Sequence, residues 1–209
     1  MGVAARIEGD LRVAGDLFVD KDIPDIPRSS LTQDVLAEFS VPFTECRVHD
    51  AITTLLPSAG ATDDLGLYGG TFGTNSPKLS TGDLKAAGAT TRYARFQVVL
   101  PAEYDAAQTL KLRASAGMET TVADNTATVD FEVYKSDREA GVGSDLCTTA
   151  AQSCNSLTFA DKDFTIDPTG LAAGDVLDVR VALAVNDAAT GTVVQATIGE
   201  IQLLADIKG

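Results

Sequence analysis

Residues 176–185 read Val-Leu-Asp-Val-Arg-Val-Ala-Leu-Ala-Val, with a large apolar residue at every second position from Leu177. Successive side chains of an extended strand point to opposite faces, so these apolar side chains share one face. The pattern predicts a β-strand with one face in a hydrophobic core. Turn-forming sequences flank it, Asp-Pro-Thr-Gly at 167–170 and Asn-Asp-Ala-Ala-Thr-Gly at 186–191, which indicates a chain that reverses at both ends.

The same alternation recurs along the chain on both sides of this stretch. In residues 193–207 the apolar phase shifts near Gly199, which indicates a β-bulge within the last strand. The other clear strands are predicted over residues 92–100, 109–116 and 126–135, and shorter ones over 43–50, 52–56, 64–68, 77–80, 155–159 and 162–166.

A series of strands without intervening helices is typical of an antiparallel sandwich rather than of βαβ units. We therefore predict an all-β fold, a jelly-roll-like antiparallel β-sandwich that occupies residues 42–209. The loops are uneven in length, and the chain has no tryptophan to pack an antibody-type core, so a jelly roll is favoured over an immunoglobulin fold.

One short helix is predicted before the sandwich, within a linker of residues 29–41. Ser29 or Ser30 would cap it, and apolar residues follow at helical spacing through Phe39 until Pro42 ends it.

Residues 1–28 are predicted to form an extended amino-terminal β-arm. The unit Gly-Asp-Leu-x-Val occurs at residues 9–13 and again at 15–19, and two Ile-Pro pairs follow. A hairpin of this size cannot bury its apolar face alone, so the arm should oligomerise or dock on a partner. The residues predicted to make that interface are Leu11, Val13, Leu17, Phe18, Val19, Ile23 and Ile26.

The formal net charge of −14 limits the possible partners. Nucleic acids are bound chiefly by neutralising phosphates, and anionic membrane surfaces attract basic segments, so we expect neither as a partner. We also find no transmembrane run and no secretory signal.

No catalytic motif is present, and we predict no enzyme, no cofactor and no metal site. His49 is the only histidine and is interpreted as a surface or interface residue. The acidic groups at residues 63–64, 124–125 and 161–163 could attract calcium, but none matches a calcium-binding loop, and solvated turns are the preferred interpretation. Cys46, Cys147 and Cys154 are expected to be free thiols, with a Cys147–Cys154 disulfide left open.

Two further features could mark a binding surface. The glycine-rich region 57–89 is longer than a plain connection requires, which usually indicates a functional or interface loop. Arg92, Arg95, Lys111 and Arg113 would form a basic patch if their strands were neighbours. The preferred interpretation is ordinary cross-strand pairing with Asp130 and Glu132.

Taken together, the Gly-Asp-Leu-Arg-Val and Gly-Asp-Leu-Phe-Val repeat, the Ile-Pro segment, the helix after Ser29-Ser30 and the β-rich remainder resemble head decoration (cement) proteins of tailed bacteriophages. This resemblance implies a virion protein made in the host cytoplasm. It would form a homotrimer on the capsid surface, bind the major capsid protein between capsomers and so stabilise the head.

The repeat alone also resembles attachment domains of phage fibres and spikes, which leaves a second hypothesis open. On it, the chain is a receptor- or glycan-binding module that uses the 57–89 loop, with Tyr68, Phe72 and Tyr93 as candidate contacts. An enzyme is the third hypothesis, and no motif supports it.

Overall fold

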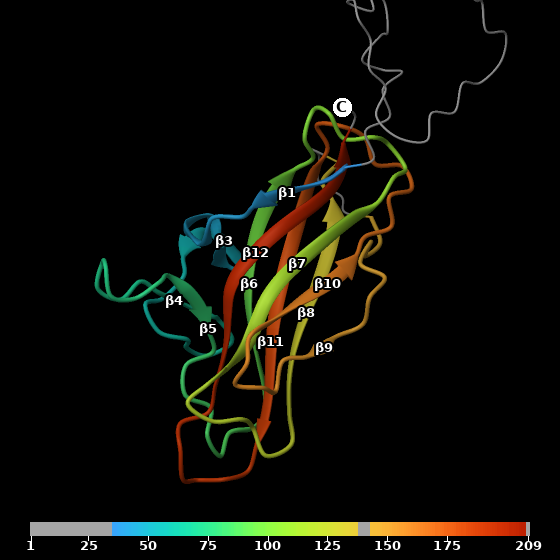
Figure 1. Cartoon of the computed structure of the whole chain (residues 1–209). Helices are drawn as coiled ribbons and strands as arrows, with labels where there is room; N and C mark the ends of the chain where they lie inside the picture. The colour runs from blue at the N-terminus through green and yellow to red at the C-terminus, as the bar shows by residue number, and fades with distance from the viewer. Residues whose placement is uncertain (1–34, 138–142, 208–209) are drawn as a thin grey trace, which may run out of the picture.

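The computed structural model describes residues 35–137 and 143–207. Two antiparallel sheets of six strands each pack face to face (Figure 1). The predicted β-sandwich is therefore confirmed. The predicted arm and all seven of its interface residues lie outside the described residues.

The first sheet has the strand order β10-β7-β12-β5-β4, and β1 also pairs with β12. Residues 195–205 of β12 pair with β7 along one edge, and its other edge pairs with β5 and then with β1. The strands of this sheet are β1 (Val35–Ser40), β4 (Gly66–Tyr68), β5 (Lys78–Ser80), β7 (Leu110–Glu119), β10 (Ala160–Thr165) and β12 (Gln195–Ile207).

The second sheet has the order β3-β2-β6-β11-β8-β9. Its long strands β6, β11 and β8 lie side by side and carry most of its pairing. The strands are β2 (Arg47–Val48), β3 (Ala51–Leu55), β6 (Gly88–Val99), β8 (Thr126–Lys135), β9 (Gln152–Ser153) and β11 (Val176–Asp187).

The core lies between the two sheets and is built from the alternating apolar positions. In β11, burial alternates along the whole strand, as the sequence of residues 176–185 predicts. Phe131 of the second sheet meets Phe164 of the first edge to face, with ring centroids 5.0 Å apart. Such aromatic contacts add to the free energy of burying the rings, so the two sheets share one core.

The predicted helix is wrong from Val35 onward, because residues 35–40 form strand β1. This segment pairs in register with β12, from Val35 opposite Ile207 to Ser40 opposite Gln202. A helix of two to three turns is marginal in water, whereas the unpaired edge of β12 offers a ready set of backbone partners. The short 3-10 turn η2 (Phe43–Glu45) follows, so the strand predicted over 43–50 is reduced to β2.

The last strand changes register between Ile198 and Glu200, so the predicted bulge at Gly199 is confirmed. The strand predicted over 155–159 is absent from the described chain, which bends there. Phe159 instead lies across glycines of the first sheet: a Cβ placed on Gly117 would come within 2.8 Å of its ring. Within residues 35–137 and 143–207, no helix combines the length and apolarity needed to span a membrane.

Candidate binding site on the open face of the second sheet

The outward face of β6, β11 and β8 carries the candidate site. Strand register places Arg95, Arg180 and Glu132 in one row across the three strands, and Gln97, Asp178 and Tyr134 in another. The alternation that sends every second residue of these strands into the core sends these side chains outward. The site is therefore built on the most extensively paired part of the sheet.

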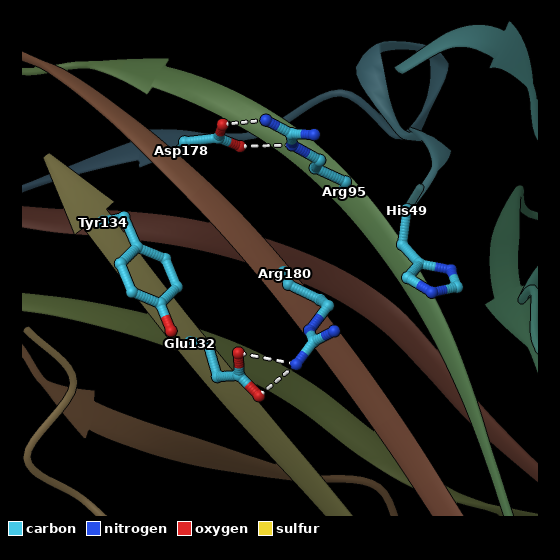
Figure 2. A pocket seen from close by; sticks show the side chains of 6 residues that line it. All are labelled: His49, Arg95, Glu132, Tyr134, Asp178 and Arg180. Carbon is cyan, nitrogen blue, oxygen red and sulfur yellow. Dashed lines mark hydrogen bonds and ion pairs between the residues drawn. The ribbon is translucent and has the colours of Figure 1, made fainter. Parts of the chain in front are cut away.

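Two ion pairs link neighbouring strands across this face (Figure 2). Arg95 donates from Nε to Asp178 Oδ1 at 2.7 Å and from Nη2 to Asp178 Oδ2. Arg180 Nη2 donates to both carboxylate oxygens of Glu132, at 2.5 and 2.7 Å. These hydrogen bonds raise the pKa of both arginines above the ordinary value, and they hold four charged groups in fixed positions.

Aromatic rings lie directly beside the ion pairs. The guanidinium of Arg180 sits 4.7 Å from the ring centroid of Tyr93, within cation–π range. The His49 ring, from the turn between β2 and β3, lies 4.8 Å from the same Tyr93 ring. Burial, followed by the charge of Glu132, raises the pKa of Tyr134, so its hydroxyl keeps its proton at neutral pH.

These groups line a hollow of about 280 Å³ whose walls are His49, Arg95, Glu132, Tyr134, Asp178 and Arg180 (Figure 2). The charges of the two arginines cancel those of the two carboxylates in this lining. The lining therefore presents closely spaced hydrogen-bond donors and acceptors whose charges balance. Such an arrangement suits a polar, uncharged ligand better than a strong anion or cation.

The four basic residues that the sequence grouped do not form one patch. Arg92 and Arg95 lie on β6 in the second sheet, and Lys111 and Arg113 lie on β7 in the first. Cross-strand ion pairs do form, as expected, but the predicted pairing of these basic residues with Asp130 and Glu132 is wrong. Arg95 pairs with Asp178, Lys111 and Arg113 pair with Asp163, and Glu132 pairs with Arg180.

The three aromatic candidates are placed differently from one another. Tyr93 lies under Arg180 beside the hollow. Tyr68 lines a separate hollow in the loop region, where Lys78 lies over its ring and is paired with Glu119. Phe72 is fully exposed. Sequence reasoning missed Asp178, Arg180 and Tyr134 as site residues, although they occupy the outward positions of strands whose inward positions it identified.

All three cysteines are free, as expected, so the Cys147–Cys154 disulfide that the sequence left open is not formed. Burial raises the pKa of Cys46 to about 12 and the pKa values of Cys147 and Cys154 to about 11. Thiols with such pKa values are protonated at neutral pH and are poor nucleophiles.

No protein-family model matches this sequence, and no curated protein matches it. Among solved structures, the chain is similar to the xylan-binding module CBM15 over 84% of this chain and 100% of that one, at 12% identity and a TM-score of 0.46. It is also similar to the CBM22-1 xylan-binding domain from Paenibacillus barcinonensis Xyn10C, over 84% and 96% of the two chains, at 14% identity and a TM-score of 0.41.

A third similar structure is the K1 cleaved adhesin domain of Lys-gingipain from Porphyromonas gingivalis. It matches over 81% of this chain and 99% of that one, at 13% identity and a TM-score of 0.40. At these identities and TM-scores, the function of this chain has to be inferred from its own side chains.

Proposed function

We propose that this chain is a non-catalytic binding module that takes a neutral glycan on the open face of its second sheet. The observation that carries the proposal is the hollow in which two arginine–carboxylate pairs lie beside Tyr134 and the His49–Tyr93 pair. Neighbouring hydroxyl groups of a sugar each donate and accept hydrogen bonds. A guanidinium next to a carboxylate supplies the matching acceptor and donor partners at similar spacing.

The rigidity of the site supports binding rather than simple surface solvation. Each of the four charged side chains is held by a partner on the adjacent strand. Groups that are already fixed lose little conformational entropy when a ligand arrives. The overall charge of −14 disfavours polyanionic ligands, which narrows the proposal to neutral glycans.

Affinity electrophoresis through gels that contain soluble neutral or acidic polysaccharides tests this proposal. At least one neutral polysaccharide should retard the wild-type protein. Arg180→Met removes the guanidinium that contacts both Glu132 and Tyr93, and we expect it to weaken binding at least tenfold.

The matched control is Arg113→Met, which removes an arginine from an ion pair on the outer face of the other sheet. It should bind as the wild type does. The proposal is wrong if no polysaccharide retards the wild type, or if both variants lose the same affinity while circular dichroism shows both to be folded.

A role in assembly is a second candidate, and one described feature favours it. Leu36 and Phe39, on edge strand β1, are more than a third exposed, at 38% and 36%. An edge strand with exposed apolar side chains can pair with another chain. A homotrimer seated on a major capsid protein, as the decoration-protein resemblance implies, would use such a surface together with the preceding arm.

Light scattering on the full chain tests this second candidate. Replacing both apolar side chains, as Leu36→Ser with Phe39→Ser, should lower a trimeric mass to that of smaller species. A wild type that is monomeric at every concentration would argue against self-assembly.

A further inference from the structure

His49 lies among three carboxylates at one end of the site. It follows β2 in a tight turn, and its side chain is only 13% exposed. Asp63 and Asp64 come from the glycine-rich region and are held by the backbone of β6: Tyr93 donates its N–H to Asp63 O, and Leu65 donates to Tyr93 O. Residues 63–64 and strand β6, which come from different parts of the chain, are therefore both held beside His49.

Both ring nitrogens of His49 face carboxylate oxygens. Nδ1 lies 3.2 Å from Asp64 Oδ1, and Nε2 lies 3.8 Å from Asp63 Oδ2. Asp50 adds a third carboxylate: one ligand atom from each of His49, Asp50 and Asp64 lies within 4.8 Å of the others. Within the part of the chain that the structure describes, this is the one group of three or more possible metal ligands at such spacing.

This geometry poses a hydrogen-bonding problem for a neutral imidazole. The ring carries one N–H and one lone pair, so only one of its two nitrogens can donate to a carboxylate. The other directs a lone pair toward carboxylate oxygens. A cation bound at Nδ1 removes that repulsion and leaves Nε2–H directed at Asp63. Metal-binding histidines typically have this arrangement, with the second ring nitrogen donating to an outer carboxylate.

We infer that His49, Asp50 and Asp64 form a binding site for a divalent cation of the zinc class, with Asp63 as the outer carboxylate that orients His49. With ligand bonds of about 2.0–2.1 Å, neighbouring ligand atoms in a tetrahedral zinc site lie about 3.3 Å apart. The 3.2 Å separation of Nδ1 and Asp64 Oδ1 meets that requirement. Asp50 is exposed, and its carboxylate lies within 4.8 Å of the ligand atoms of His49 and Asp64.

The donor set also discriminates between cations. One imidazole nitrogen with two carboxylates suits first-row divalent ions, whereas calcium requires six to eight oxygen ligands. Three protein ligands leave a coordination position for water. The inference goes beyond the proposed glycan binding and does not depend on it. Because His49 also lines the hollow, a cation bound to it would hold this part of the lining in place.

Isothermal titration calorimetry tests the inference, with zinc chloride added to tag-free full-length protein that has been treated with EDTA. We expect one zinc ion per chain. Asp64→Asn and His49→Gln should each weaken binding at least tenfold. The control Asp161→Asn removes an exposed acid elsewhere and should bind zinc as the wild type does. Calcium should not compete at equal concentration.

Cobalt(II) serves as a spectroscopic probe, because the free cysteines are alternative ligands. The wild-type complex should show visible bands of a tetrahedral site without a thiolate charge-transfer band, and Asp64→Asn should lose those visible bands. The inference fails if zinc does not bind, if all variants bind equally, if a thiolate band appears, or if calcium binds more tightly than zinc.

Discussion

The outer faces of the two sheets carry the same kind of ion pair in different surroundings. On the first sheet, Arg113 donates to Asp163 from Nε at 2.6 Å and from Nη2 at 3.1 Å, and Glu38 and Asp161 lie nearby. On the second sheet, Arg95 makes a similar bidentate ion pair with Asp178. The second face adds the Tyr93 ring under Arg180 and a wall from the His49 turn.

This difference shows that a paired arginine on a sheet does not by itself indicate a binding site. On the first face, the hydrogen bond to Asp163 and then the charges of Asp163, Asp161 and Glu38 raise the pKa of Arg113, and its Nε, Nη1 and Nη2 all donate to carboxylates of the protein. On the second face, the pairs border a hollow that a ligand could enter. Three predictions test how much the shared core and one charged group on each face contribute to stability.

The largest effect is expected from the core, because both faces depend on it. Phe164 is fully buried and contacts Phe131 of the opposite sheet. Phe164→Ala would leave a cavity and should lower the free energy of unfolding by about 3–5 kcal/mol. Urea unfolding followed by circular dichroism measures this, since the chain has no tryptophan. The exposed Phe72→Ala is the control, with an expected change within about 0.5 kcal/mol.

A single transition for Phe164→Ala would confirm that the sheets unfold together. Two transitions would show instead that the faces rest on separable cores, and a loss similar to that of Phe72→Ala would contradict the role of Phe164 in the core.

A smaller effect is expected from the ion pair of the first face. The hydrogen bond from Arg113 holds the pKa of Asp163 below its ordinary value. The stabilisation is therefore present above the unfolded pKa, near 4, and is lost as the pH falls through the lower folded pKa. Asp163→Asn should cost at most about 1 kcal/mol at pH 7, and the difference from wild type should shrink below pH 4 in urea titrations. A cost that stays constant with pH would rule out this charge effect.

The smallest effect is expected at the edge of the second face. Burial raises the pKa of Asp130, and the charges of Glu132 and Asp145 act in the same direction. Relative to a neutral side chain, Asp130 therefore carries no penalty below the unfolded pKa, where its carboxyl is protonated in both states, and it destabilises the protein once the pH has risen through the folded pKa. Asp130→Asn keeps the Oδ1 that accepts from Phe131 N–H, so it should stabilise the protein by a few tenths of a kcal/mol at pH 7.

That gain should vanish near pH 3, which thermal melts at both pH values can check. A gain of equal size at low pH would point to packing rather than to charge.

The strands show which structural features the sequence predicts correctly and which it does not. Apolar alternation at residues 176–185, and likewise at 109–116 and 126–135, predicts both the strand and the face that is buried, because burial follows the period of the backbone. Within residues 31–39 the prediction from the sequence fails. Their apolar spacing suits a helix, yet residues 35–40 form β1, because the free edge of β12 supplies backbone partners that no local pattern reveals.

In the candidate site, too, some features follow from the sequence and others only from the tertiary structure. The sequence by itself determined that this is a two-sided β-protein with a strongly acidic surface, because side-chain alternation and charge are local properties. Only the tertiary structure decided that Arg180 would stand between Arg95 and Glu132, and that His49 would meet Asp64. Those neighbours depend on which strands pair and in which register, and that choice is made by contacts between segments far apart in the chain.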